Sequence, residues 1–293
     1  MIKNYQTSYR LALLTLLANL FIVSNVSANN IVKKIKEVES ELGARVGVSI
    51  VDTTSNNLWN YEGDTRFPLM STFKTLACAK LLFDVEKGKQ SLDTSVVITS
   101  NSLINWSPVT EKLVGQSYSL KQACSAAMTM SDNTAANIIL AGINGPKSLT
   151  KFMQSIGDNV TRLDRIEPEL NEALEGDKRD TTTPNAMVKS LHKLLFGDVL
   201  SQPSKTQLTQ WMIDSKVTDS LLRSVLPNSW LIADKSGSGG FGSRGITAVV
   251  WPQSGSPIII SIYLAQTKAT FTQRNKAIAD IGKEIFARYQ DKS

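Results

Sequence analysis

Apolar and polar positions divide the chain into a strand-rich beginning, a helical middle and a strand-rich end. Residues 44–52 alternate Val and Ile with smaller side chains, residues 58–61 form a second apolar run, and Ser55-Asn56-Asn57 lies between them, which is typical of a β-hairpin. Three further β-type runs, bounded by Gly, Ser or Pro, cover residues 230–235, 246–251 and 258–264. An amphipathic pattern over residues 272–289 predicts a closing helix.

The middle of the chain has helical periodicity. Apolar residues recur at helical spacing between Phe73 and Leu82, and Gly88 supplies a stop signal, so a helix is predicted over residues 71–86. Further helices are predicted over residues 133–141, 147–156, 184–196 and 204–214. Strands at both ends and helices between them predict an α/β fold of the α+β type. In it, an antiparallel sheet is built from both termini and an all-α lobe is inserted.

A long aperiodic stretch, residues 161–183, interrupts the helical region. It contains many charges and a proline, and a loop of this length inside a compact domain is usually functional. Because no Pro/Gly/Ser-rich linker or repeat divides the chain, we expect a single domain over residues 29–293. The α/β lobe is expected over residues 29–64 and 215–293, and the helical lobe over residues 65–214.

The first 28 residues have the composition of a secretory signal peptide. Lys3 and Arg10 precede an apolar run over residues 11–23, and Val26-Ser27-Ala28 fits a small-x-Ala cleavage site. The run is too short to span a bilayer comfortably, so an uncleaved anchor is the less favoured alternative. We therefore expect an exported protein with no stable membrane association after cleavage.

Composition and charge are those of an ordinary globular protein, with 42% hydrophobic and 20% charged residues. Removal of residues 1–28 takes away two basic residues and no acidic one, which lowers the formal net charge from +6 to +4. The Lys and Arg residues are scattered, which argues against a nucleic-acid patch. We expect a monomer without a nucleic-acid partner.

Two cysteines, Cys78 and Cys124, remain after signal cleavage. An even count in an oxidising compartment predicts one disulfide bond, which would stabilise a fold with a loop of this length by roughly 4 kcal/mol. The alternative is two separate buried thiols, because free cysteines are common core residues.

The chain contains one histidine, His192. A Ser-His-Asp triad would have to be built around it, and one His with two Cys cannot supply the usual zinc ligands. The simplest interpretation of His192 is a residue at the surface or the edge of the core. We expect no metal and no cofactor, and the base for a nucleophilic serine must then be Lys or a carboxylate.

The Ser-x-x-Lys spacing places both side chains on one face of a helix, where the amine can reach the hydroxyl. It occurs three times, at Ser71/Lys74, Ser148/Lys151 and Ser190/Lys193, so at least two matches are accidental. Ser71 differs because it opens a strongly apolar helix, where free N–H groups and the helix dipole can stabilise an oxyanion. Burial in that helix would favour the neutral form of Lys74 and suit it to proton transfer.

Two further motifs follow, Ser131-Asp132-Asn133 and Lys235-Ser236-Gly237, each present once. Ser-x-x-Lys, Ser-Asp-Asn and Lys-[Ser/Thr]-Gly are together the motif set of class A β-lactamases and penicillin-binding proteins. The chain resembles class A β-lactamases over essentially its whole mature length. Other segments that carry the resemblance are residues 165–171, 179–182 and 221–224.

Residues 131–137 and 261–266 are most similar to the carbenicillin-hydrolysing branch, although Lys235 stands where that branch is expected to have Arg. The resemblance implies the fold shared by serine β-lactamases and penicillin-binding proteins. It also implies hydrolysis of small-molecule β-lactams through an acyl-serine intermediate, by a periplasmic or secreted bacterial enzyme that confers antibiotic resistance. Ser238, next to two glycines, favours a narrow pocket for penicillins and early cephalosporins, with Trp106 at its mouth.

The resemblance implies a role for each acylation residue. Ser71 attacks the lactam carbonyl, and the backbone N–H groups of Ser71 and Ser238 hold the oxyanion. Ser131 relays a proton to the departing ring nitrogen, and Lys74 stands one helical turn from Ser71. Asn133 is expected to bind the side-chain amide of the substrate.

A substrate carboxylate is bound by cationic and hydroxyl groups, and Lys235, Ser236 and Arg244 are expected to supply them. The alternative for Arg244 is an exposed strand charge. Asp132 is expected to brace the Ser131 loop through backbone hydrogen bonds rather than to touch substrate.

Glu167 distinguishes a β-lactam hydrolase from the nearest alternative function, that of a penicillin-binding D,D-peptidase. Glu167 and Asn171 are expected to hold the deacylating water, with Glu167 as general base, and a salt bridge between Arg165 and Asp180 to pin the ends of the loop. Either Glu167 or Lys74 could serve as the base in acylation. A penicillin-binding D,D-peptidase shares the three motifs but does not need the Glu167/Asn171 pair. A non-catalytic β-lactam sensor would need a membrane segment coupled to a signalling domain.

Overall fold

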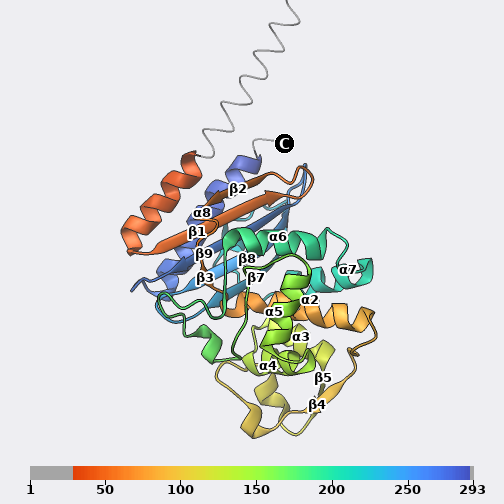
Figure 1. Ribbon diagram of the computed structural model, residues 1–293. Helices are drawn as coiled ribbons and strands as arrows, with labels where there is room; N and C mark the ends of the chain where they lie inside the picture. The colour runs from red at the N-terminus through yellow and green to blue at the C-terminus, as the bar shows by residue number, and fades with distance from the viewer. Residues whose placement is uncertain (1–28, 291–293) are drawn as a thin grey trace, which may run out of the picture.

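The computed structural model describes residues 29–290, so the predicted signal peptide over residues 1–28 lies outside the described part. A five-stranded antiparallel sheet with strand order β2-β1-β9-β8-β7 forms the upper half of the molecule (Figure 1). The strands are β1 (Arg45–Asp52), β2 (Leu58–Tyr61), β7 (Leu231–Ser238), β8 (Arg244–Trp251) and β9 (Ile258–Ala265). β1 pairs with β9 along its whole length, which confirms that both ends of the chain build one sheet.

Helices cover both faces of this sheet. The helix over residues 29–42 and α8 (Phe271–Gln290) cover one face, where their apolar side chains form a cluster with those of β1, β8 and β9. α6 (Pro184–Leu195) and the helical lobe cover the other (Figure 1). Since β9 is buried on both faces, its sequence is an almost unbroken apolar run rather than an alternating one.

The helical lobe lies below the sheet in Figure 1. Its remaining helices are α2 (Phe73–Glu86), α3 (Leu120–Thr129), α4 (Asn133–Gly142), α5 (Pro146–Ser155) and α7 (Gln202–Ile213). Two short ribbons accompany them, β3 (Phe67–Pro68) with β6 (Thr181–Thr182), and β4 (Ser95–Val97) with β5 (Ser117–Ser119). The elements predicted from periodicity are all present, with boundaries that differ by up to three residues.

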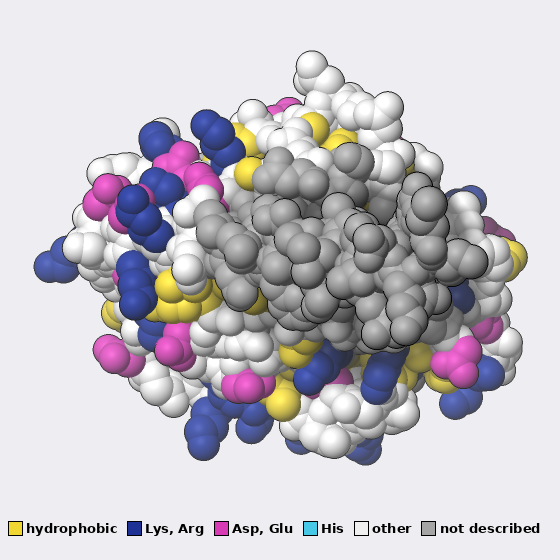
Figure 2. Space-filling model, turned by 90° about the horizontal axis from the view of Figure 1, so that it is seen from above, with side chains coloured by type: hydrophobic (Ala, Val, Ile, Leu, Met, Phe, Trp, Pro, Cys, Tyr) yellow, Lys and Arg dark blue, Asp and Glu magenta, His cyan; other side chains and the backbone are white. Residues whose placement is uncertain are grey.

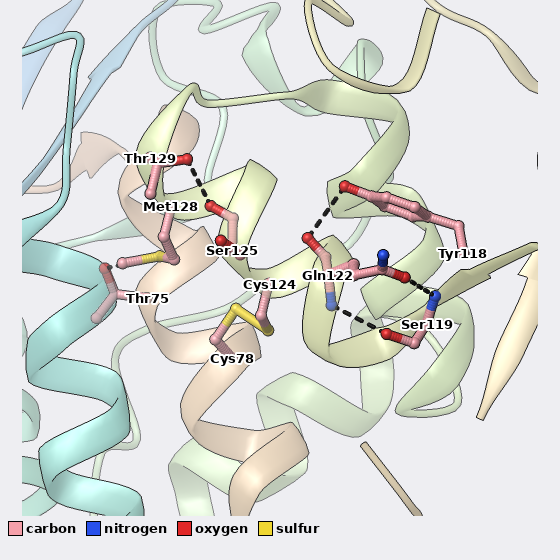
Figure 3. The surroundings of a disulfide bond; sticks show 9 residues. All are labelled: Thr75, Cys78, Tyr118, Ser119, Gln122, Cys124, Ser125, Met128 and Thr129. Carbon is pink, nitrogen blue, oxygen red and sulfur yellow. Dashed lines mark hydrogen bonds between the residues drawn. A yellow bond between two sulfur atoms is a disulfide. The ribbon is translucent and has the colours of Figure 1, made fainter. Parts of the chain in front are cut away.

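Two helices are not predicted by the sequence patterns, α3 and the helix over residues 29–42. α3 is short and rich in small residues, so its apolar periodicity is weak. Its start does carry a signal, because Ser119 and Gln122 form a capping box in which each side chain accepts the backbone N–H of the other (Figure 3). That Ser-x-x-Gln spacing is the feature from which α3 could have been predicted.

A disulfide bond joins Cys78 on α2 to Cys124 on α3 (Figure 3). The prediction of one bridge is therefore confirmed, and the alternative of two free thiols is excluded. The bridge closes a loop with a sequence separation of 46, which corresponds to about 4 kcal/mol in the chain-entropy model. It fixes α3 against α2, the helix that follows Ser71.

The surface seen from above is chemically mixed. Figure 2 shows basic and acidic side chains next to one another on this face, with apolar side chains scattered between them. Such interleaving is typical of a solvated surface. Between residues 29 and 290, no helix is both long enough and apolar enough to cross a membrane.

Candidate active site

Ser71 lies in a 3₁₀ turn, η1 (Met70–Thr72), directly before α2. The α-helix predicted from residue 71 therefore starts two residues later, because the chain first makes a tight turn. Met70 has a φ of 48°, a left-handed conformation that large side chains rarely adopt and that often accompanies functional sites. Ser71 itself is buried in this turn, with 8% of its surface exposed.

Strand β7 passes directly beside Ser71. A Cβ atom at Gly237 would lie 2.8 Å from Ser71 N and 2.7 Å from Met70 Cβ, so this position accepts only glycine. The close approach brings the end of β7, where Ser238 stands, next to the backbone of Ser71. The structure thus brings together the two residues whose N–H groups form the predicted oxyanion hole.

Lys74 lies on α2, one helical turn after Ser71, and is completely buried. Its Nζ donates to Ser131 O at 2.8 Å, to Ser131 Oγ at 3.3 Å and to Asn133 Oδ1 at 2.7 Å. Glu167 Oε1 lies 3.2 Å from the same Nζ. Burial lowers the pKa of Lys74, and the attraction of Glu167 opposes that shift without cancelling it.

The Ser131-Asp132-Asn133 segment is held by Asp132, as predicted. The Asp132 carboxylate is buried and accepts backbone N–H groups of Val109 at 3.0 Å and Thr110 at 2.9 Å. It also caps α4 by accepting the N–H of Ala135 at 2.9 Å. Ser131 has a φ of 57°, so a strained backbone again accompanies a predicted catalytic hydroxyl.

Lys235 stands on β7 and is also completely buried. Its Nζ donates to Ser131 Oγ at 3.0 Å and to Ser236 O at 2.8 Å. Burial, followed by repulsion from Lys74 and Arg244, lowers the pKa of Lys235 well below its ordinary value. Two buried amines therefore contact the one hydroxyl of Ser131.

Arg244 lies on β8 and is 3% exposed, so the exposed-charge alternative is wrong. Its Nε donates to Asn275 Oδ1 at 2.7 Å, its Nη1 donates to Gly237 O at 2.9 Å, and its guanidinium lies 4.7 Å from the ring centre of Phe271. Burial lowers the pKa of Arg244 to about 10. Neither Phe271 nor Asn275 has a sequence signal, because both lie in α8, far along the chain from the motifs.

Glu167 and Asn171 meet on the long loop, as predicted. Asn171 Nδ2 donates to Glu167 Oε2. The Glu167 backbone is fixed from α4 by Asn137, whose Oδ1 accepts the Glu167 N–H and whose Nδ2 donates to the Glu167 carbonyl, both at 2.9 Å. Asn137 is a positioning residue that lies within the recognised motif segment, but the sequence gives no sign of this contact.

The predicted salt bridge that closes the loop is present, with Arg165 Nε 2.6 Å from Asp180 Oδ2. Asp180 is 1% exposed and also accepts the backbone N–H groups of Asp164 at 2.7 Å and Arg165 at 2.9 Å. A second carboxylate, Glu172, contacts Arg165 Nη1 at 2.5 Å. The loop ends are therefore joined by one buried carboxylate.

The predicted site residues converge on a cavity of about 300 Å³. It is lined by Ser71, Trp106, Ser131, Asn133, Asn171, Ser236, Gly237, Ser238 and Arg244, together with Val217 and Phe271. Trp106 stands at the surface, 59% exposed, and donates its Nε1–H to Met130 O at 3.2 Å. Lys74, Glu167 and Lys235 do not line the cavity; they are buried behind its wall.

The other Ser-x-x-Lys matches lie outside this cavity. Ser190 Oγ donates to Asp158 Oδ2 at 2.7 Å, and the exposed Lys193 donates to Ile156 O at 2.5 Å. His192 is partly buried on α6, where it stacks on Phe196 and its Nε2 lies 3.3 Å from Thr53 O. This position at the edge of the core agrees with the simplest interpretation.

Fold and site together are those of a serine hydrolase, in which a buried lysine and a buried glutamate lie behind the cavity that Ser71 and a guanidinium line. Comparison with known proteins identifies the family. The model of the β-lactamase enzyme family matches residues 29–289, and the chain belongs to that family, as a class A serine β-lactamase. A D,D-peptidase is not favoured.

Its relatives and structural neighbours are similar over nearly the whole chain. β-Lactamase CARB-3 of Pseudomonas aeruginosa is 52% identical over 285 residues, which cover 97% of this chain and 99% of that protein. The chromosome-encoded β-lactamase of Vibrio parahaemolyticus is 52% identical with a TM-score of 0.87, over 89% of this chain and 99% of that one. An ancestral class A β-lactamase (GNCA) is 45% identical with a TM-score of 0.86, over 88% and 99% of the two chains.

Proposed function

We propose that Ser71 is the nucleophile of a penicillin hydrolase in which Lys74 serves acylation and Glu167 serves deacylation. The observation that supports this division is the position of Lys74 Nζ, which contacts Ser131, Asn133 and Glu167 from a completely buried position. One amine thus connects the hydroxyl that protonates the leaving nitrogen with the carboxylate that activates water.

In acylation, Ser71 Oγ bonds to the lactam carbonyl carbon and the carbonyl–nitrogen bond of the ring breaks. Burial lowers the pKa of Lys74 and so favours the neutral amine, which is the form that accepts the Ser71 proton. Ser131 Oγ, 3.3 Å from Lys74 Nζ, delivers a proton to the ring nitrogen and receives one from Lys74. The N–H groups of Ser71 and Ser238 stabilise the oxyanion.

In deacylation, water replaces the serine oxygen. Asn171 Oδ1 is a buried acceptor without a hydrogen-bond donor among the described residues, and Glu167 Oε1 has there only its ion pair with Lys74, so both oxygens keep acceptor capacity for a polar molecule. Glu167 accepts the proton of the water, the water oxygen bonds to the ester carbon, and the bond to Ser71 Oγ breaks. The proton returns to Ser71.

Substrate binding uses the cavity wall. Arg244 and Ser236 line the cavity and bind the substrate carboxylate, while Lys235 donates a hydrogen bond to Ser131 Oγ from behind the cavity wall. Asn133 binds the side-chain amide, and Trp106 forms an apolar edge at the mouth.

The substrate range follows from the contact between β7 and the long loop. Gly240 N donates to Asn171 O at 2.8 Å, and a Cβ at Gly239 would lie 2.9 Å from that same oxygen. A Cβ at Gly240 would lie 2.4 Å from Glu172 O. This side of the cavity is therefore tight, which favours penicillins and early cephalosporins over substrates with bulky oxyimino side chains.

Export to the periplasm or the cell exterior is the third part of the proposal. The composition of residues 1–28 supports a cleaved signal peptide. The disulfide between Cys78 and Cys124 supports an oxidising compartment.

The proposal is tested by steady-state kinetics of purified residues 29–293 on carbenicillin and an oxyimino cephalosporin, with and without a chelator. We expect chelator-insensitive hydrolysis, with kcat/KM for the penicillin higher by at least about tenfold. Equal values for the two substrates would overturn the substrate range. Loss of activity on chelation would overturn the serine mechanism.

A further inference from the structure

A second cavity, of about 390 Å³, lies beneath the long loop and shares no lining residue with the active-site cavity. Its lining includes five cationic residues and two carboxylates: Arg45, Arg66, Arg165, Lys178 and Arg179 against Glu175 and Asp177. Leu170, from the turn between Glu167 and Asn171, forms part of the wall. The cavity is therefore cationic and directly joined to the loop that carries the proposed general base.

Arg45 is held in this cavity by direct contacts with neutral groups. Its Nη1 donates to Arg66 O at 2.9 Å and its Nε donates to Gln266 Oε1 at 3.2 Å. Its guanidinium lies 4.3 Å from the ring centre of Phe67. All three partners are neutral, and no carboxylate of residues 29–290 lies within ion-pair distance of Arg45.

Arg66, adjacent to Arg45, is held in the same way. Its Nη1 donates to Val160 O at 2.8 Å and to Thr181 Oγ1 at 2.9 Å. Within the described part of the chain it too has no ion-pair partner. Two arginines whose guanidinium groups are hydrogen-bonded but form no ion pair within residues 29–290 thus line one cavity.

The arginines of the long loop do form ion pairs, so the lack of any described ion pair at Arg45 and Arg66 is not a general feature of the region. Arg162 pairs with Asp164 at 2.5 Å, Arg165 with Asp180 at 2.6 Å, and Arg179 with Asp177 at 2.7 Å. The only carboxylate of the cavity lining without such a pair among the described residues is Glu175. It is exposed, and together with Glu62, which is exposed and outside the lining, it acts on Arg45 only at a distance.

The closest parallel to Arg45 within this protein is Arg244. Each guanidinium is oriented by a backbone carbonyl and a side-chain amide oxygen, and each lies over a phenylalanine ring. In Arg244 this arrangement leaves a cation ready for the carboxylate of the substrate. The same arrangement in Arg45 leaves a cation ready for an anion in the second cavity.

We propose that this second cavity is a binding site for a phosphate group, free or as a small ester, held between Arg45 and Arg66. Two guanidinium groups in fixed orientation match the several acceptor oxygens of phosphate. Arg45, at the start of β1, and Leu170 and Ala173, on the long loop, all line this cavity. An anion bound there contacts both the sheet and the loop. Binding therefore stabilises the long loop in its folded position, and the site is independent of the proposed catalytic roles.

The test is calorimetric titration of the mature protein with inorganic phosphate at constant ionic strength, with glycerol phosphate as a second arm that distinguishes free phosphate from an ester. We expect Arg45→Gln and Arg66→Gln to weaken binding at least tenfold. Glu175→Gln removes the nearby negative charge and should tighten binding severalfold. Lys89→Gln, an exposed site outside both cavities, removes one positive charge like Arg45→Gln and should leave affinity unchanged.

Two further variants keep the result interpretable. Arg45→Lys retains the charge and should bind phosphate better than Arg45→Gln, which separates loss of charge from loss of fold. Arg244→Gln should leave phosphate affinity unchanged. The proposal is overturned if Arg244→Gln abolishes binding while Arg45→Gln does not, because the anion then occupies the active site. Absence of binding and of a Tm increase at tens of millimolar phosphate overturns it as well.

Discussion

The two halves of the active site are built in different ways. The half that contains Ser71 rests on packed secondary structure, with Lys74 and Lys235 completely buried between α2 and β7. The half that contains Glu167 lies on a loop, where few apolar side chains are buried and position depends on polar contacts from Asn137 and from the salt bridge between Arg165 and Asp180.

This difference indicates that deacylation depends on structural elements that acylation does not need. A change in the packed half alters the nucleophile and the proton relay, and so affects both steps. A change in the loop half alters the position of Glu167 and leaves Ser71 and Lys74 in place. Deacylation should therefore be able to fail while acylation persists, but not the reverse, and substitutions can test how complete this separation is.

The largest effect is expected from Ser71→Ala. Without the hydroxyl no acyl-enzyme can form, so kcat should fall by a factor of at least about 10⁴ and no mass adduct should appear with any penicillin. Intact-protein mass spectrometry and steady-state rates measure both quantities. A variant that still formed an adduct would show that another residue is the nucleophile.

Glu167→Ala should affect one step only. Deacylation loses its general base, which contributes about 10²–10⁴ in rate, while Lys74 remains to accept the Ser71 proton. We expect a rapid burst of one equivalent followed by a persistent adduct with the mass of the intact penicillin added. Normal steady-state turnover would contradict the role of Glu167, and absence of the adduct would show that Glu167 is also needed for acylation.

The packed half of the site can be predicted from the sequence more fully than the loop half. Helical periodicity identifies α2 and so predicts that Lys74 is buried and lies on the same helix face as Ser71, whereas Ser131 and Lys235 come from the motif set of the family. For the loop, only its length and aperiodicity can be predicted from physical reasoning. Its residues and their pairing come from the family resemblance, because irregular backbone has no period that links sequence to position.

The contacts that cross between distant elements could not be predicted. Phe271 and Asn275 orient Arg244 from α8, and Asn137 holds Glu167 from α4. Each contact depends on how two elements pack, and packing of side chains is decided by tertiary structure rather than by local pattern. α3 is a different case, because its capping box at Ser119 is a local signal.

Asp180→Asn should weaken the loop half by an intermediate amount. The change removes a buried charge that accepts three hydrogen bonds, so the free energy of unfolding should fall by about 2–4 kcal/mol. Deacylation should slow, because Glu167 loses its fixed position, whereas the acylation rate should change little. Urea denaturation and stopped-flow single-turnover kinetics measure the two effects.

Arg179→Gln is the control for that experiment on the same loop. Its ion pair with Asp177 is exposed on the arginine side, so the loss of stability should be much smaller than for Asp180→Asn. If Arg179→Gln and Asp180→Asn slow deacylation equally, the loop does not depend on the buried carboxylate at its ends.

The smallest effect on catalysis is expected from Ser190→Ala, which removes a serine with the same spacing to lysine as Ser71. Ser190 is 2% exposed and donates to Asp158 at 2.7 Å, and Asp158 in turn holds the N–H groups of Val160 and Thr161. Loss of a buried hydrogen bond to a carboxylate should lower the free energy of unfolding by about 1.5–3 kcal/mol. Acylation and deacylation rates should both remain unchanged, because Ser190 lies outside the active-site cavity and Lys193 is exposed, with its Nζ hydrogen-bonded to Ile156 O. A selective change in either rate would show that the support of the active site extends through α6.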